Sequence, residues 1–238
     1  MAKFSESISL VIPAYNEEKR IYSVLKNYVS FLEKEFSDYE LIVACNNCSD
    51  ETPEIVKSFA EKNKKVKALN FPFFTGKGGA VKKGFEVASK ELIGFVDADE
   101  STSPKEFRKI VSALLEKNAG AAIGSRALPE SVLSQRQPFF RQFVGKSFGA
   151  IVNLLFGLGV RDTQCGAKLF RKKALKQILP QLKLDGWEFD VEILWRLKKS
   201  GFSIAEVPIE WRNDPNSKIK PWSALEMFLG LLRLRFFG

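Results

Sequence analysis

The sequence predicts an α/β fold: a mostly parallel, Rossmann-like sheet flanked by helices on both faces. In the first half of the 238 residues, short apolar runs rich in β-branched residues alternate with longer amphipathic stretches. The runs are almost continuously apolar, which is typical of strands buried on both faces of a parallel sheet. Polar, turn-rich segments follow several of them. Right-handed crossovers bring such segments together at one edge of the sheet.

Each element follows from local signals. The first strand is Ile8–Ile12, which ends at Pro13, and later strands are expected at residues 40–44, 66–70, 92–96 and 121–124. Helices are expected at 17–36, from Ser49 or Asp50 to 63, at 78–89 and at 104–117, and two of them begin at Ser, Asp or Pro start signals. We expect one domain over residues 1–213 and a C-terminal amphipathic helix over 214–238.

Composition excludes several classes of function. The chain has no histidine, which excludes Ser/His/Asp triads and most catalytic zinc sites. Lys and Arg outnumber Asp and Glu by 37 to 28, a net charge of +9. This surplus points to an anionic partner, either nucleic acid, a lipid headgroup or a phosphorylated small molecule. Since no basic stripe interleaved with aromatic residues stands out, we do not expect nucleic acid.

The three cysteines do not form a disulfide framework. Cys45 and Cys48 form a Cys-x-x-Cys pair, which is either a redox motif or a turn at the end of a strand. Nothing else in the chain resembles a thioredoxin, so the turn is the favoured interpretation.

Three short segments carry candidate chemistry. Asp97-Ala98-Asp99 directly follows the strand at 92–96, where two carboxylates suit Mg²⁺ or Mn²⁺, although an acidic turn that caps the next helix is the alternative. The glycine-rich segment 75–80 opens a helix, either as an anion cradle or as a simple strand-to-helix turn. Arg126 ends the fifth strand, where a guanidinium is suited to bind phosphate or to lie on the surface.

In this order, the segments resemble the family 2 glycosyltransferases of the GT-A fold. The resemblance rests on residues 9–18, the loop 76–80, Asp97-Ala98-Asp99 and Gly124-Ser125-Arg126. Residues 161–170 and 187–192 are similar to the dolichyl-phosphate hexosyltransferase branch, above all to its β-glucosyltransferases and next to its mannosyltransferases. The resemblance covers essentially the whole chain.

The resemblance implies a role for each of these loops. Donor binding is implied for Pro13, Ala14, Tyr15, Glu17, Ala44, Asn46, Lys77, Asp97, Ala98, Arg212 and Lys218. It further implies a metal ion on Asp97 and Asp99, an acceptor phosphate on Arg126 and Arg141, and catalytic roles for Asp99, Arg126, Asp162 and Gln164. Arg136 is a further candidate cation for the acceptor phosphate, and Asp190 is a candidate catalytic base. The family often has two Asp where this chain has Cys45-Asn46, so the base, uridine or guanosine, stays open.

The expected reaction is inverting transfer of a hexose, with glucose favoured, from UDP-glucose or GDP-mannose to dolichyl phosphate. A phosphate monoester has a second pKa of about 6, so this acceptor needs no general base. The first alternative is a soluble glycan hydroxyl as acceptor, with Asp190 as its base. A remote alternative is a basic protein that binds nucleic acid.

Two stretches, 139–160 and 222–238, are apolar on one helical face and carry basic residues. Charges and glycines in the first stretch, and the length of the second, argue against spanning helices. We expect interfacial helices on the cytoplasmic face of a membrane, as in a peripheral enzyme. Packing of the second stretch on the domain or on another subunit is the alternative, and a homo-oligomer stays open.

Overall fold

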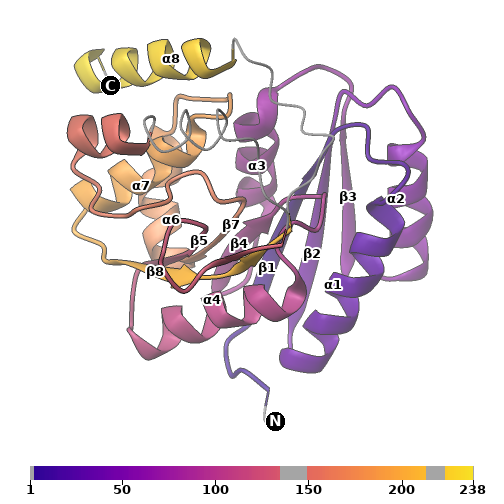
Figure 1. Ribbon diagram of the computed structural model, residues 1–238. Coiled ribbons are helices and arrows are strands. Elements are labelled where there is room, and N and C mark those ends of the chain that lie inside the picture. The colour runs from indigo at the N-terminus through magenta and orange to yellow at the C-terminus, as the bar shows by residue number, and fades with distance from the viewer. Residues whose placement is uncertain (1–2, 135–148, 213–222, 238) are drawn as a thin grey trace.

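A seven-stranded sheet forms the centre of the computed structural model, which describes residues 3–134, 149–212 and 223–237 (Figure 1). The strands lie in the order β3-β2-β1-β4-β7-β5-β8. Their bounds are β1 Ile8–Ala14, β2 Tyr39–Asn46, β3 Val66–Phe71, β4 Leu92–Val96, β5 Ala121–Ser125, β7 Ala167–Arg171 and β8 Ile204–Pro208. Only β7 runs antiparallel to its neighbours β4 and β5. The predicted mostly parallel sheet is therefore confirmed.

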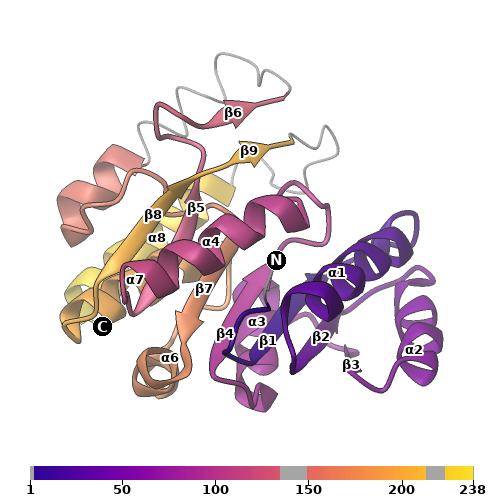
Figure 2. The same ribbon diagram turned by 90° about the horizontal axis from the view of Figure 1, so that it is seen from below.

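Helices cover both faces of the sheet, which Figure 2 shows from below. One face carries α1 Ile21–Glu35, α2 Thr52–Lys62 and α4 Pro104–Glu116, and the other carries α3 Gly76–Val87, α6 Lys172–Ile178 and α7 Phe189–Lys199. A 3-10 turn, Leu179–Gln181, follows α6. The two faces correspond to two separate apolar clusters.

Strand β1 shows why a mostly apolar run forms a central strand. Successive side chains of a strand point to opposite faces. Ile8, Leu10 and Ile12 join the cluster under α1 and α4, whereas Val11 joins the cluster under α3 and α7. Both faces are covered, so these four positions are apolar, and the hydroxyl of the buried Ser9 donates to Oε1 of Glu40 at 2.6 Å.

The second half contains elements that the sequence analysis did not place. β7 lies between β4 and β5, β8 forms one edge of the sheet, and β6 Val132–Leu133 pairs with β9 Glu210–Trp211 in a separate two-stranded sheet. Of the helix expected at 139–160, residues 149–156 are helical, and residues 139–148 lie outside the described part.

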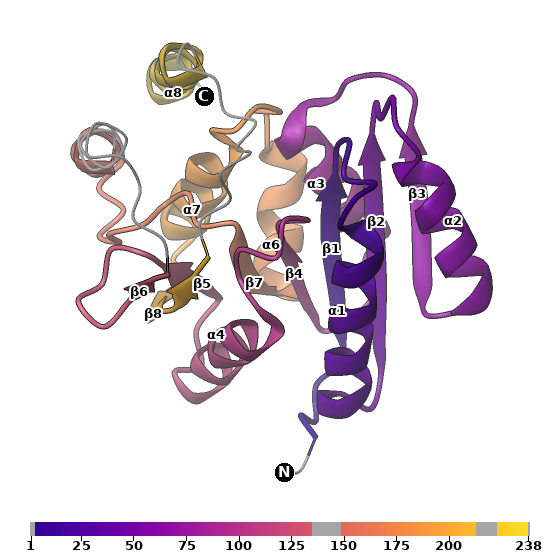
Figure 3. The same cartoon turned by 45° about the vertical axis from the view of Figure 1, so that its right-hand side comes forward.

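The C-terminal helix α8 spans Ser223–Phe237 and packs on the domain. Its residues Met227, Leu231 and Leu234 are buried, and the two leucines share an apolar cluster with Trp195 of α7. Figure 3 shows α8 and the helical residues 149–156 nearly end-on, so their axes run roughly parallel. Among the described helices, none combines the length and apolarity needed to cross a membrane.

Candidate active site

The acidic loop after β4 holds Asp97 and Asp99. The amide of Asp97 donates to the carbonyl of Gly166 at 3.0 Å, and the amide of Ser101 donates to Oδ1 of Asp99 at 2.9 Å. Burial and the negative charge of Asp97 raise the pKa of Asp99. The two carboxylates therefore lie close enough to repel each other, as the spacing predicts.

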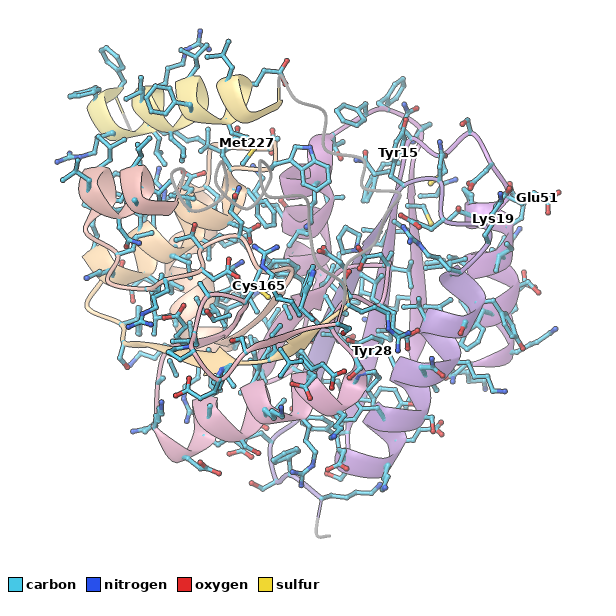
Figure 4. All side chains as sticks on the ribbon, viewed as in Figure 1. Tyr15, Lys19, Tyr28, Glu51, Cys165 and Met227 are labelled. Atoms are coloured by element: carbon cyan, nitrogen blue, oxygen red, sulfur yellow. The ribbon has the colours of Figure 1, made fainter. Side chains whose placement is uncertain are left out.

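Tyr28 of α1, labelled in Figure 4, supports this loop through a hydrogen bond. It is buried, and its hydroxyl donates to the carbonyl of Thr102 at 2.6 Å. Burial, together with the charges of Glu100, Asp97 and Asp99, raises its pKa well above the ordinary value. The phenol therefore stays protonated and keeps donating to the loop at all ordinary pH values.

Lys77 supplies the cation next to this loop. Its Nζ lies 2.6 Å from Oδ1 of Asp97 and 5.1 Å from the centre of the Trp187 ring. Burial opposes the charged form, but Asp97 and Asp190 attract it, and the pKa of Lys77 is raised. A charged amine is therefore held between the acidic loop and the segment before α7.

The glycine-rich segment packs closely against the backbone of Asp185 and Gly186. The amides of Gly78 and Gly79 donate to the carbonyls of Gly186 and Asp185, at 3.3 and 3.2 Å. A Cβ at Gly76 would lie 2.1 Å from the carbonyl oxygen of Asp185. The amides of Gly78 and Gly79 are therefore used within the protein, which favours the strand-to-helix turn, and an anion cradle on this segment stays a prediction.

Asn46, at the end of β2, holds the same segment. Its Oδ1 accepts from the amide and hydroxyl of Thr75 at 2.9 and 3.0 Å, and its Nδ2 donates to the carbonyl of Gly76 at 3.1 Å. The side chain is buried. Asn46 thus positions the residues that lead to Lys77, which is a structural task beside the donor-binding role that the resemblance implies.

The other proposed donor residues surround the carboxyl ends of β1 and β2. Pro13 pairs with Ala44 across these strands, and Ala14 and Ala44 are buried. The partly exposed Tyr15 meets Phe74 edge-to-face at 6.2 Å. Further along, Ala98 is buried within the acidic loop.

Glu17 begins the turn that leads into α1. Its amide donates to the hydroxyl of Thr52 at 2.7 Å, and its carboxylate pairs with Arg20. These contacts make Glu17 a local organiser of the loop, and they leave its implied contact with the donor a prediction.

Arg126 and Asp162 form a two-pronged ion pair. Nε and Nη2 of Arg126 donate to Oδ2 and Oδ1 of Asp162 at 2.7 and 2.9 Å, and the guanidinium lies 4.9 Å from the centre of the Trp211 ring. Burial opposes ionisation of both groups, but each charge stabilises the other, so the pKa of Arg126 is raised and that of Asp162 is lowered. Both groups are charged at neutral pH.

Glu206 and Gln164 complete this arrangement. Oε1 of Glu206 accepts from the amides of Arg161 and Asp162 at 2.9 and 2.8 Å, and the amide of Gln164 donates to Oδ1 of Asp162 at 3.2 Å. Glu206 lies on β8, so the last strand of the sheet orients the ion pair. Glu206 carries no signal in the sequence, because no local pattern links it to Asp162.

Asp190 is buried at the start of α7. Its Oδ1 lies 2.6 Å from Nζ of Lys168, which also donates to the carbonyl of Cys165 at 2.6 Å (Figure 4 labels Cys165). Burial raises the pKa of Asp190, and the nearby lysines oppose that rise. Asp190 is therefore an ion-pair partner in the interior, and its role as a general base for a hydroxyl acceptor stays a prediction.

The backbone brings Arg212 to the acidic loop, because its amide donates to the carbonyl of Ser101 at 3.0 Å. Arg136, Arg141 and Lys218 lie outside the described residues. The Cys-x-x-Cys pair holds two free thiols, and Sγ of Cys48 donates to the carbonyl of Ala14 at 3.5 Å. The structure therefore agrees with a turn at the end of β2.

The donor set of the acidic loop suits a divalent ion. Mg²⁺ is usually held by one or two carboxylates together with oxygens of substrate phosphates. Asp97 and Asp99 offer such a pair, and residues 3–134, 149–212 and 223–237 contain no group of three or more acidic or cysteine side chains that makes a closed cage. The residues present therefore fit an ion that is shared with a diphosphate.

Comparisons with known proteins agree with this site. The profile of the family described as Glycosyl transferase family 2 matches residues 9–179. The dolichyl-phosphate beta-glucosyltransferase of Dictyostelium discoideum is 36% identical over 241 residues, which cover 96% of this chain and 74% of that protein. The Homo sapiens protein of the same name is 32% identical, over 97% of this chain and 75% of that protein.

Solved structures show the same fold. Glucosyl-3-phosphoglycerate synthase of Mycobacterium tuberculosis, crystallised with Mn²⁺ and UDP-glucose, aligns with a TM-score of 0.69 at 16% identity and covers 97% of this chain and 79% of that one. The family profile extends from β1 past β7, and the relatives match nearly the whole chain. This chain therefore belongs to glycosyl transferase family 2 and is a glycosyltransferase of the GT-A fold.

Proposed function

We propose that this enzyme transfers glucose from UDP-glucose to dolichyl phosphate, with inversion at the anomeric carbon. The curated relatives with 32 to 36% identity are dolichyl-phosphate beta-glucosyltransferases. The observation that carries the proposal is the position of Lys77 and the Asp97–Asp99 pair at one edge of the sheet, with the salt bridge of 2.6 Å between Lys77 and Asp97. This is the arrangement that a leaving nucleoside diphosphate requires.

The charges of the site are suited to the donor. Asp97 and Asp99 would hold Mg²⁺ or Mn²⁺, which stabilises the negative charge that develops on the departing diphosphate. Lys77 adds a positive charge that is already in place beside the acidic loop before the donor binds. Arg212, which reaches the acidic loop through its backbone, is the second cation available to the diphosphate.

The acceptor supplies its own nucleophile. An oxygen of the dolichyl phosphate attacks the anomeric carbon, the bond from that carbon to the β-phosphate oxygen breaks, and UDP leaves with the electron pair. Because the phosphate is already ionised, no side chain has to remove a proton. Arg126 orients the acceptor phosphate in this proposal, with Asp162 holding the guanidinium in place at 2.7 Å.

The acceptor also implies where the enzyme works. Dolichyl phosphate is anchored in lipid, so the reaction takes place at a membrane surface, and the water-soluble donor favours the cytoplasmic face. A glycan hydroxyl as acceptor needs a general base instead, and the buried pair of Asp190 with Lys168 is poorly suited to that task.

A donor panel tests the proposal. The purified chain is incubated with radiolabelled UDP-glucose, GDP-mannose or other nucleotide sugars, dolichyl phosphate in detergent, and Mg²⁺ or Mn²⁺. We expect lipid-extractable label from UDP-glucose, which Asp99→Ala abolishes. The control variant Asp38→Ala removes an exposed carboxylate, directly before β2, that pairs with Lys90, and it is expected to keep wild-type activity.

Two results would contradict the proposal. If no donor labels the lipid fraction, the acceptor assignment is wrong. If Asp190→Asn abolishes transfer to a soluble glycan while the enzyme ignores dolichyl phosphate, a hydroxyl acceptor with a general base is the correct reaction.

A further inference from the structure

The most exposed large apolar side chains of the described residues gather in three segments. They are Phe73 and Phe74 between β3 and α3, Leu154 in the helical residues 149–156, and Leu225, Phe236 and Phe237 of α8, all between 62% and 87% exposed. In the rest of the described chain, no large apolar side chain is more than 59% exposed. Such a concentration marks a contact surface rather than scattered single residues.

Helix α8 is apolar on two opposite faces. Met227, Leu231 and Leu234 face the domain and are buried. On the other side, an outward stripe follows the i, i+4, i+7, i+11 spacing of one helical face and consists of Leu225, Leu229, Leu232 and Phe236. A helix that is apolar on all sides is normally buried on all sides, so we expect the outward stripe to be buried against another apolar surface.

The three segments lie toward one end of the molecule. Nε of Arg235 in α8 donates to the carbonyl of Leu155 at 2.9 Å, which joins α8 to the helical residues 149–156. In Figures 1 and 3, α8 and the loop between β3 and α3 lie at the same end, and Figure 4 shows Tyr15 and Met227 toward it. The carboxyl ends of β1 and β2 point to this end, so the surface borders the active site.

The charge around the surface favours lipid as the cover. The exposed Arg233 and Arg235 flank the outward stripe, with Glu226 as the one acidic residue of α8, and the chain carries a net charge of +9. Arginines that flank an apolar stripe reach lipid headgroups while the stripe enters the acyl boundary.

We propose that this end of the molecule lies in the interface of a lipid bilayer, with Phe73 and Phe74 inserted as a separate contact beside α8. The functional reason for this contact rests on the proposed function, since a lipid-anchored acceptor has to reach the site from that side. Two residues after Phe73, Thr75 is hydrogen-bonded to Asn46, and Lys77 then meets Asp97. The inserted loop is therefore continuous with the site.

Vesicle flotation of the full chain tests the surface. Vesicles of phosphatidylcholine alone are compared with vesicles that also contain phosphatidylglycerol, and the second kind is expected to bind more protein. Phe73→Ser is expected to lower the partition coefficient about 5- to 10-fold, and Leu229→Ser/Phe236→Ser about 10- to 100-fold. The control Val87→Ser changes an exposed apolar residue at the other end of α3 and leaves partition within about twofold.

The outcomes separate the surface from the reaction. The inference is overturned if both surface variants bind vesicles as well as the wild type does. It is also overturned if the wild-type protein is a dimer that binds no vesicles and that these variants dissociate. Transfer to dolichyl phosphate in detergent is expected to stay at the wild-type rate in Phe73→Ser and in Leu229→Ser/Phe236→Ser. If vesicle binding follows these expectations but no lipid is ever glycosylated, the proposed function fails and the surface stands.

Discussion

Gly166 leaves the space that the carboxylate of Asp97 fills. A Cβ at Gly166 would lie 1.8 Å from Oδ2 of Asp97, which is nearly a covalent distance. The carbonyl of Gly166 also accepts from the amide of Asp97 at 3.0 Å. Gly166, directly before the antiparallel strand β7, thus sets the position of the first carboxylate of the acidic loop.

Gly166→Ala is therefore expected to displace the Asp97 carboxylate. Since one misplaced electrostatic group in a site costs about 10²- to 10³-fold in rate, we expect kcat to fall by about 10²-fold or more at saturating Mn²⁺. The measurement is initial-rate transfer, with the melting temperature as a check on folding. Gly149→Ala is the matched control, because among the described residues its Cβ would come near the carbonyl oxygen of Arg161 alone, at 3.8 Å. Full activity of Gly166→Ala would show that this contact does not position Asp97.

Lys77→Met removes the cation that pairs with Asp97. We expect kcat to fall by about 10²- to 10³-fold, because the departing diphosphate loses a fixed positive charge. Lys83→Met is the control on the same helix, where Nζ pairs with the exposed Glu86 at 3.0 Å. If both variants lose activity equally, the effect comes from α3 and not from the charge at the site.

Arg126→Lys replaces the two-pronged pair with Asp162 by a single contact. A hydrogen bond to a charged group contributes about 1.5–3 kcal/mol, so we expect kcat/KM for the acceptor to fall by roughly 10- to 100-fold. The KM for the donor should change little. Arg108→Lys, whose Nε pairs with Glu35 at 2.9 Å on α1, is the control. A change confined to the donor KM would contradict the acceptor role.

Lys168→Met leaves the carboxylate of Asp190 buried without its partner. Breaking a buried pair from one side costs about 3–5 kcal/mol, so we expect the free energy of unfolding to fall by that amount at neutral pH. Because burial raises the pKa of Asp190, the loss should shrink as the pH falls and the carboxyl takes up a proton. Denaturant unfolding measures both. Lys168→Met/Asp190→Leu should recover most of the stability, and no recovery would contradict the electrostatic explanation.

Glu40 gives the protein part of its sensitivity to acid. Burial alone would raise its pKa, but Lys67 at 2.6 Å, Ser9 and Ser89 lower it to about 2 from an ordinary 4.5. The stabilisation is fully present above pH 4.5 and is lost as the pH falls toward 2. Glu40→Gln should therefore lose about 1–3 kcal/mol at neutral pH, and the difference from wild type should vanish near pH 2. A difference that does not change with pH would exclude this linkage.

The sequence by itself determined the class of fold and the chemistry of the acidic loop. The run Ile8–Ile12 is apolar except for the buried Ser9 and is suited to a strand between two covered faces, so the sheet with helices on both sides follows from local pattern. The same holds for Asp97 and Asp99, whose position after a buried strand places them at the edge where ligands bind. Both the apolar run and the acidic pair consist of residues that are close together in the sequence.

Tertiary structure alone decided how distant segments meet. Three features join parts of the chain that no local period connects. They are the reversed direction of β7, the hydrogen bonds from the glycine-rich segment to the carbonyls of Asp185 and Gly186, and the pairing of Lys168 with Asp190. Such contacts are selected by packing and by the need to satisfy buried polar groups. Periodicity reports which side of an element is buried, but it carries no information about which element covers that side.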